Sequence, residues 1–178
     1  MTTDYSEEIL DLVDAEDTVI GTITHEEAFD LPRDGGRYVR AAHALIVNKK
    51  GEVWIPRRIA SKRIAPNGLD FSAAEHVASG ETYLEAIVRG FEEELNLSVE
   101  PDMFSEIGKT YPKPGAIPYV TVDYIIYMDE APANYSADDF SGAEWLNPNE
   151  LLRRLKDGET AKENLANSIR LLIDYISV

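Results

Sequence analysis

Residues 80–97, read as GETYLEAIVRGFEEELNL, combine residue types and spacings that could bind a metal ion. Three consecutive glutamates, Glu92, Glu93 and Glu94, follow Arg89 by about one helical turn. Carboxylates gathered on one short helix repel one another unless a cation neutralises them. Their hard oxygen atoms suit Mg²⁺ or Mn²⁺ better than zinc or copper. Because Mg²⁺ is commonly shared with substrate phosphates, the pattern indicates diphosphate chemistry, although taken alone it is more typical of a solvated acidic helix.

The helix that must position these carboxylates is well specified by the sequence. Thr82 and Glu85 form the Ser/Thr-x-x-Glu pattern of a capping box. A buried stripe is predicted from the apolar residues at helical spacing, which are Leu84, Ile87, Val88, Phe91 and Leu95. Arg89 lies four residues from both Glu85 and Glu93 and can pair with either. Gly90 is anomalous, because glycine inside a helix costs about 1 kcal/mol relative to alanine.

The same stretch resembles a Nudix box, whose pattern is Gly, five residues, Glu, seven residues, then Arg-Glu-apolar-x-Glu-Glu-x-Gly-apolar. The matching residues are Glu81, Arg89, Phe91, Glu93, Glu94 and Leu97. Three positions depart from the pattern: Glu75 replaces the opening glycine, Gly90 replaces the glutamate after the arginine, and Asn96 replaces the final glycine. The change at Asn96 is mild, because asparagine tolerates the left-handed conformation that ends a helix.

The resemblance implies roles for the matching residues. Glu93 and Glu94 would be the metal ligands, and Arg89 with Glu81 would brace them. Gly90 removes a carboxylate that in this family often binds metal or activates water. Glu75 is our candidate to replace it as metal ligand and catalytic carboxylate, since the family's glycine at this position has its backbone near the metal. The alternative is that the site is degenerate and that Glu75 is merely exposed.

A wider stretch, from Asp11 to about Glu150, resembles the Nudix branch related to isopentenyl diphosphate isomerase. His76 matches a histidine of that isomerase, but Ala74 stands where its cysteine is expected and Val39 where another histidine is expected. Isomerase chemistry is therefore disfavoured. The PRR, SGETY and EWL segments are more similar to bacterial hydrolases of this branch, which cleave nucleoside diphosphates or similar substrates.

Composition indicates one soluble domain over residues 1–178. The chain has 17 Lys and Arg against 33 Asp and Glu, a formal net charge of −16, which disfavours nucleic acid polymers and anionic membranes as partners. The absence of cysteine excludes disulfides and thiolate catalysis. The acidic start MTTDYSEE lacks a signal-peptide pattern, so a cytoplasmic location is expected. The resemblance also makes a homodimer plausible.

The order of predicted elements is mixed. We expect an N-terminal strand extension over about residues 8–40, with a strand at 18–24 and a helical turn at 25–29. Further strands are expected at 41–47, 53–57, 71–77, within 98–109, at 119–128 and at 144–146. Beyond the box, at about 75–97, helices are expected at 149–156 and 161–176. This order fits an α/β (α+β) fold, and the Nudix resemblance implies a mixed sheet between helices.

Substrate-binding candidates come from a basic cluster in and after the second strand of the central hairpin. These candidates are Arg57, Arg58 and Lys62, since arginine suits bidentate contact with phosphate. Strand periodicity places Arg57 and Arg58 on opposite faces, so only one should face the site. The alternative is that these cations pair with the abundant surface acids. Among the histidines, His25 and His43 are expected to be structural, and His76 is the one to test.

Together these observations predict metal-assisted hydrolysis of a nucleoside diphosphate, or of a nucleoside diphosphate linked to another group. Mg²⁺ or Mn²⁺ on Glu93 and Glu94 would polarise the diphosphate and orient water, and either Glu75 or Glu93 would accept the water's proton. A second hypothesis, suggested by Gly90, is a nucleotide-binding or interaction module without turnover.

Overall fold

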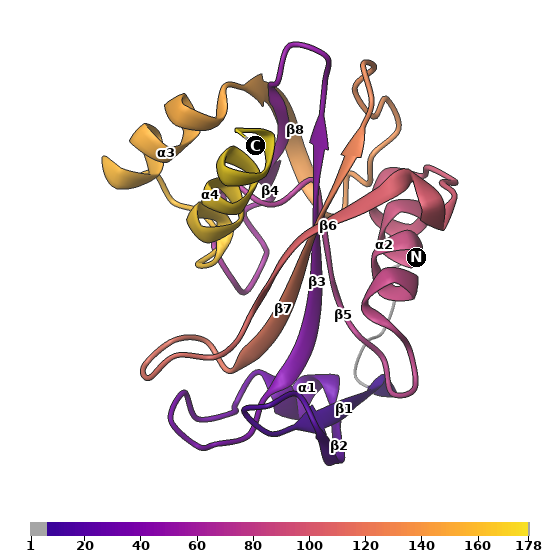
Figure 1. Cartoon of the computed structure of the whole chain (residues 1–178), viewed down its shortest axis with the longest axis vertical. Coiled ribbons are helices and arrows are strands. Elements are labelled where there is room, and N and C mark those ends of the chain that lie inside the picture. The colour runs from indigo at the N-terminus through magenta and orange to yellow at the C-terminus, as the bar shows by residue number, and fades with distance from the viewer. Residues whose placement is uncertain (1–6, 178) are drawn as a thin grey trace.

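The computed structural model describes residues 7–177, so most of the acidic N-terminal segment considered above, and Val178, lie outside the described residues. The strands are β1 (Ile9–Val13), β2 (Val19–Thr24), β3 (Val39–Val47), β4 (Val53–Arg58), β5 (Ala73–His76), β6 (Phe104–Thr110), β7 (Tyr119–Tyr127) and β8 (Phe140–Leu146). The helices are α1 (His25–Ala28), α2 (Tyr83–Leu95), a 3₁₀ turn (Pro101–Met103), α3 (Pro148–Lys156) and α4 (Leu165–Ile176). Figure 1 shows the main sheet between α2 on one side and α3 with α4 on the other. The predicted mixed α+β fold is confirmed.

The centre of the main sheet is β3. It pairs in parallel with β7 along its whole length, and β6 continues the sheet beyond β7. On its other edge, β3 pairs with β5 over Ala41–Ala44 and with β4 only at Val47. β4 in turn pairs with β8. Beyond this edge of β3 the sheet therefore divides into two branches, β5 and the β4–β8 pair.

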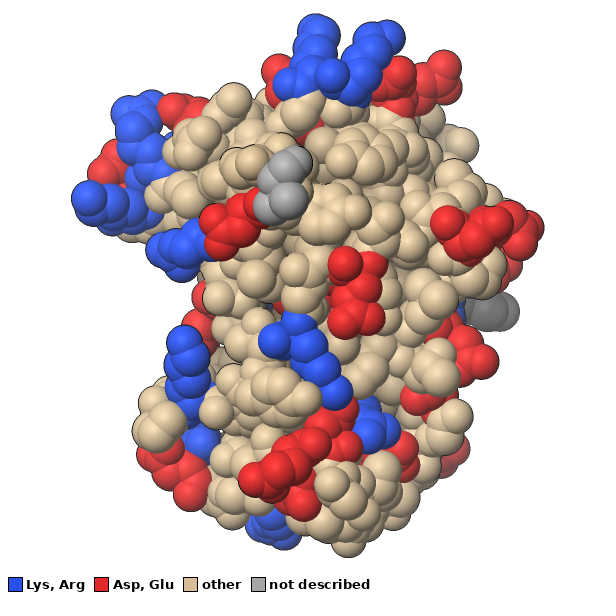
Figure 2. All heavy atoms as spheres, viewed as in Figure 1, with Lys and Arg blue, Asp and Glu red and all other residues tan. Residues whose placement is uncertain are grey.

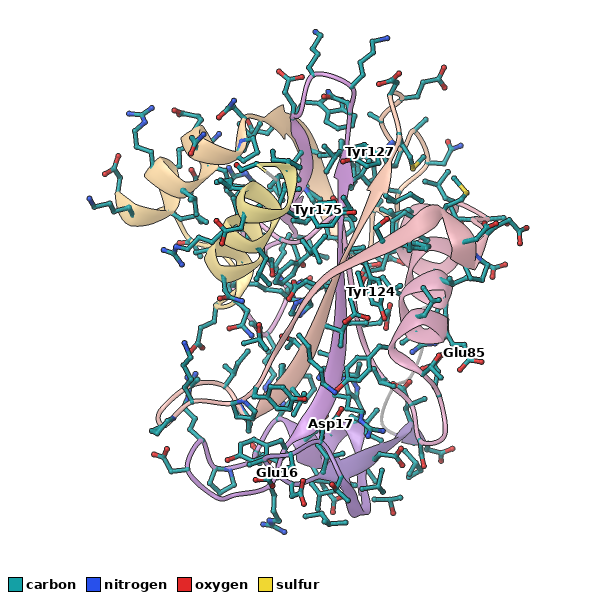
Figure 3. All side chains as sticks on the ribbon, viewed as in Figure 1. Glu16, Asp17, Glu85, Tyr124, Tyr127 and Tyr175 are labelled. Carbon is teal, nitrogen blue, oxygen red and sulfur yellow. The ribbon has the colours of Figure 1, made fainter. Side chains whose placement is uncertain are left out.

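Alternate residues of β3 face two different cores, as the period of two in a strand requires. Ala42, Ala44 and Ile46 pack in a cluster with Ile87 and Phe91 of α2. On the opposite face, the cluster contains residues of β3 and of both C-terminal helices, namely Leu45, Val47, Leu151, Leu165, Ile169 and Leu172. Figure 3 labels Tyr124 of β7, which belongs to the cluster on the α2 side. The sheet therefore holds α2 and α4 in fixed positions on its two faces.

The β1–β2 hairpin is tied to the rest of the molecule through Asp17 (labelled in Figure 3). Its carboxylate accepts hydrogen bonds from Arg40 Nε at 2.6 Å, Lys109 Nζ at 2.5 Å and Tyr83 Oη at 3.1 Å. Burial of the carboxyl acts to raise the pKa of Asp17, but the hydrogen bonds and positive charges of Lys109 and Arg40 together outweigh it and lower the pKa. The hairpin turn thus connects β3, β6 and the first turn of α2.

Most predicted elements lie within a few residues of their observed bounds, but two differ in an informative way. The strand expected at 71–77 is shorter, Ala73–His76, and the helix expected from residue 161 begins at Leu165. Ala161 instead forms a parallel bridge with Leu69, and the Lys162 amide donates to the Leu69 carbonyl at 3.0 Å. Tertiary pairing therefore overrides the helical pattern at these residues. No helix within residues 7–177 is long and apolar enough to cross a membrane.

Candidate active site

Helix α2 begins and ends as its sequence predicts. The Thr82 hydroxyl accepts from the Glu85 amide at 3.2 Å, and the Glu85 carboxylate accepts from the Thr82 amide at 2.8 Å. Asn96 at the other end has a φ of 52°, in the left-handed region, and its amide donates to the Glu92 carbonyl. The capping box and the asparagine C-cap together fix the register of the acidic helix against β5.

Arg89 connects the candidate carboxylates. It donates to both oxygens of Glu81 at 3.0 and 3.1 Å, to Glu75 Oε2 at 3.2 Å and to Glu93 Oε2 at 3.4 Å. It also donates to the carbonyl oxygen of His76 at 2.9 Å. The structure therefore brings together Glu75, Glu81, Glu93 and Arg89, which the sequence separates by up to 18 positions.

Glu75 occupies the space that a side chain at residue 90 would need. It pairs with Ala42 across the sheet and so points to the α2 face. A Cβ atom built on Gly90 would lie 2.5 Å from Glu75 Cγ, closer than real Cβ contacts allow. The Glu75 side chain is only 9% exposed, so the alternative of a merely exposed glutamate is wrong. The glycine in the helix and the glutamate in the strand are thus complementary: β5 supplies a carboxylate where the helix lacks one.

Glu94 is the second partly buried glutamate of the site. Its Oε2 accepts weakly from the Ala74 amide at 3.4 Å. Burial raises the pKa of Glu94 well above its ordinary value, and the nearby charge of Glu75 adds to the shift. Burial likewise raises the pKa of Glu75, while Arg89 acts against it and Glu93 adds to it. Partly buried carboxyl groups whose charged forms are disfavoured by burial and by neighbouring carboxylates form a donor set that a divalent cation would neutralise.

The donor set fits a hard divalent cation by residue type, with Glu75, Glu93 and Glu94 as the residues that would hold it. Within residues 7–177, however, no three acidic or histidine side chains are already arranged around one point as ligands. The Glu93 carboxylate is turned toward Arg89, and its side chain is 37% exposed. Because it is on the exposed side of the helix, Glu93 has room to rotate toward a cation.

A cavity of about 220 Å³ adjoins Glu75 on the side of the sheet that faces α4. Most of its lining is apolar or aromatic, and the lining includes His43, Phe71, Glu75, Lys162 and Arg33. His43 stacks on Phe71 with ring centroids 3.9 Å apart. Figure 2 shows the surface hollowed on the left, below the region of α3 and α4 in Figure 1. This combination of a flat apolar lining and a few charged groups can hold the organic part of a phosphorylated molecule.

The three predicted substrate-binding cations do not line this cavity. Arg57 pairs with Glu159 at 2.7 Å, buried Arg58 pairs with Asp70, and Lys62 pairs with Asp139. Arg57 and Arg58 have different surroundings, with a register irregularity in the strand pairing between them. In the structure each of these cations pairs with an acidic side chain, as the alternative interpretation of the sequence expected.

The cations that do line the cavity, Arg33 and Lys162, were missed by sequence reasoning. Arg33 lies in the Gly-rich loop before β3, and Lys162 lies just before α4. Neither belongs to a motif, so no local signal identifies them. Only the tertiary fold brings these distant segments to the cavity.

The histidines form two separate arrangements. The Nε2 of His25 lies 2.9 Å from the Nδ1 of His76, and burial together with His25 lowers the pKa of His76 well below its ordinary value. His43 is buried, and its Nδ1 lies 3.3 Å from Asp123 Oδ1. His25 and His43 are embedded in packing contacts as expected, but His43 also lines the cavity.

The NUDIX domain family matches residues 37–167. The chain belongs to the Nudix hydrolase family. It is 39% identical to an uncharacterized Nudix hydrolase of Nostoc sp. over 164 residues, which are 92% of this chain and 95% of the relative. The crystal structure of the Deinococcus radiodurans protein DR0079 matches with a TM-score of 0.80 and 37% identity, covering 92% of this chain and 98% of that one.

Family membership makes this Nudix protein a pyrophosphohydrolase, an enzyme of a family that acts on small phosphorylated substrates and generally requires divalent cations. Support for the branch related to isopentenyl diphosphate isomerase is weaker. An isopentenyl-diphosphate Delta-isomerase of Haloarcula marismortui is 32% identical over 98 residues, which are 55% of this chain and 50% of that enzyme. The branch therefore stays a prediction.

Proposed function

We propose that this Nudix enzyme hydrolyses nucleoside diphosphates, or nucleoside diphosphates linked to another group, with Mg²⁺ or Mn²⁺. The observation that carries the proposal is the placement of the Glu75 side chain in the space beside Gly90. The helix has lost one carboxylate of the family pattern, and a buried carboxylate from β5 lies in the same place. The departures from the box are then a compensated exchange rather than a loss of the site.

In this proposal the chain's own residues have distinct roles. Glu75, Glu93 and Glu94 hold the cation, which when bound polarises the diphosphate and favours attack by water. Arg89, braced by Glu81, sets the positions of Glu75 and Glu93 through the hydrogen bonds described above. Glu75 or Glu93 accepts the proton of the attacking water, since each is a carboxylate close to the same site.

The second candidate is a nucleotide-binding module without turnover. It is favoured by the contact between Glu93 and Arg89, which keeps this carboxylate turned away from a common metal point. Isothermal titration with nucleotides that shows binding without product would support it.

The decisive experiment is a screen for diphosphate cleavage in nucleoside di- and triphosphates, sugar nucleotides and dinucleoside polyphosphates, with Mg²⁺ and with Mn²⁺. The phosphorylated products are separated by chromatography, because cleavage of a sugar nucleotide gives two phosphate esters and no free phosphate. The matched control is the Glu93→Gln/Glu94→Gln double variant, which keeps side-chain size and removes two charges. Metal-dependent turnover that is lost in the control is the expected result. A folded protein that binds nucleotide but turns over no substrate in the screen would sink the proposal and favour the binding module.

The remaining features of the proposal concern the whole chain. We infer a small-molecule substrate rather than a nucleic acid polymer or a membrane, a single domain over residues 1–178 and a cytoplasmic location. The net charge of −16 is the main support for the choice of partners. A homodimer is proposed from the family resemblance alone, and light scattering on the purified protein tests it.

A further inference from the structure

Lys162 is held at the cavity by backbone pairing rather than by a helix. It follows Ala161, which bridges in parallel to Leu69, and its own amide donates to the Leu69 carbonyl at 3.0 Å. Leu69 belongs to the buried core under the C-terminal helices. The root of the Lys162 side chain is therefore fixed beside Asp70 and Phe71, two residues that follow Leu69 in the sequence.

The side chain of Lys162 lines the cavity beside Asp70 and Phe71. Its Nζ lies 3.4 Å from Asp70 Oδ1 and 6.0 Å from the centre of the Phe71 ring, and the side chain is 25% exposed. Asp70 already has other partners, since Oδ2 accepts from Arg58 and Oδ1 accepts from the Phe71 amide at 2.8 Å. Asp70 is thus satisfied without Lys162, and the ammonium group can move to a new anion without leaving a buried carboxylate unpaired.

The other cation of the cavity is already committed. Arg33 forms a bidentate ion pair with Glu163, with N–O distances of 2.7 and 2.8 Å, and donates to the Gly115 carbonyl at 3.0 Å. These bonds use the planar fork of the guanidinium group. Among the described residues that line the cavity, Lys162 is therefore the cation best placed to accept a substrate anion.

Lys162 also influences the carboxylates of the candidate metal site from the opposite side of the sheet. Burial raises the pKa of Glu94, and the positive charge of Lys162 acts against that shift. The same opposition applies at Glu75, where burial, Arg89 and Glu93 have larger effects. Glu75 lies in β5, and the Asp70 amide donates to the Pro56 carbonyl of β4. Because the sheet divides between β5 and β4, the charge of Lys162 beside Asp70 can act on carboxylates across the sheet. The ammonium group is thus close enough to both carboxylates for its charge to act on them.

We propose that Lys162 binds the phosphate of the substrate diphosphate that is attached to the organic moiety in the cavity, with the diphosphate lying toward Glu75 and Glu94. The inference rests on the proposed function for its substrate class. It assigns substrate binding to a lysine before α4 and not to the Arg57–Lys62 segment. Lys162 fixes the direction of the substrate, with its organic part toward His43 and Phe71 and its phosphates toward α2.

The test is a binding measurement that needs no turnover. Imidodiphosphate, a diphosphate analogue with a P–N–P bridge, and ADP serve as probes in isothermal titration with Mg²⁺. The variants are Lys162→Met and Lys162→Arg. Lys109→Met is the matched control, because Lys109 is also a half-buried lysine paired with a carboxylate, 29% exposed, but is bound to Asp17 away from the cavity. Circular dichroism confirms that each variant is folded.

We expect Lys162→Met to weaken both probes roughly 10- to 100-fold, which is the range for losing a hydrogen bond to a charged group. Lys162→Arg restores most of the affinity, and Lys109→Met binds as the unmodified protein does. Folded Lys162→Met with unchanged affinity overturns the inference, as does an unmodified protein that binds neither probe. If the probes bind as expected but no substrate is hydrolysed, the proposed function fails while the role of Lys162 in phosphate binding stands.

Discussion

At the scale of single residues, the chemistry of the site depends on the complementary pair of Glu75 and Gly90. A carboxylate is delivered to the acidic helix from a strand, and a glycine in the helix leaves room for it. Alanine is preferred to glycine inside helices by about 1 kcal/mol, so the glycine has a stability cost that its neighbour explains. Either residue alone would be a defect, and together they keep the number of carboxylates in the family pattern.

This coupling predicts an unusual double-mutant cycle. Gly90→Ala should gain helix propensity but place Cβ against Glu75 Cγ, so we expect no net stabilisation and a shift of the Glu75 carboxylate that lowers turnover. In a Glu75→Ala background the same Gly90→Ala change should stabilise the protein by about 1 kcal/mol, because the obstructing carboxyethyl group is gone. Urea unfolding of the four proteins measures the coupling. Equal effects of Gly90→Ala in both backgrounds would contradict the steric account.

At the scale of secondary-structure elements, α2 holds the glutamates in register through its ends. Thr82→Ala removes the hydroxyl that accepts from the Glu85 amide, and we expect a loss of about 1 kcal/mol in the free energy of unfolding. Thr82→Ser keeps the hydroxyl and should lose much less. Thermal unfolding of both variants measures their stabilities. Equal destabilisation would mean that the stability comes from packing of the Thr82 methyl group and not from the hydroxyl cap.

A second element-scale prediction concerns the loop between α3 and Lys162. Glu159 accepts hydrogen bonds from Arg154 and Arg57, and these bonds lower its pKa to about 2 from an ordinary value of 4.5. A lowered pKa in the folded state contributes stability above the unfolded-state value and loses it as pH falls through the folded-state value. Because Glu159 is partly exposed, Glu159→Gln should cost only about 0.5–1 kcal/mol near neutral pH.

The measurement is urea unfolding of the unmodified protein and of Glu159→Gln over a pH series. The difference between the two should be constant down to about pH 4.5 and shrink from there toward pH 2. A difference that stayed constant throughout that acidic window would show that the ion pairs do not carry the effect.

At the scale of the whole molecule, the acidic chain should gain stability from the cation it binds. Burial disfavours the charged forms of Glu75 and Glu94, and the negative charges of Glu93 at Glu75 and of Glu75 at Glu94 add to the cost, which a divalent cation would relieve. With Mg²⁺ at about 100 times its dissociation constant, we expect about 2.7 kcal/mol of stabilisation, or a rise in Tm of roughly 5–10 °C. Differential scanning calorimetry tests this, with Glu93→Gln/Glu94→Gln as the control. An equal rise in the control would place the bound cation elsewhere.

The sequence by itself predicts helix α2 more completely than it predicts the candidate site. The capping box at Thr82, the apolar stripe of α2 and the left-handed Asn96 are local features, and each could be predicted because its partners lie within a few residues. The strand at 119–128 is equally visible as an apolar run, and it is observed as Tyr119–Tyr127. Local hydrogen bonds and side-chain periodicity are sufficient for these elements.

The features of the site that the sequence alone could not predict depend on contacts between segments far apart in the chain, and only the tertiary structure decided them. The sequence places Glu75 and Gly90 at two of the three departures from the Nudix pattern, but the strand pairing of Ala42 with Glu75 brings the Glu75 side chain into the space left by Gly90. The basic residues near Arg57 look like a phosphate site in sequence, yet their charge is taken up by Glu159, Asp70 and Asp139. Lys162 reaches the cavity because Ala161 pairs with Leu69. Charge and spacing along a chain thus define which groups are available, while the packing of the sheet determines which of them remain free to meet a substrate.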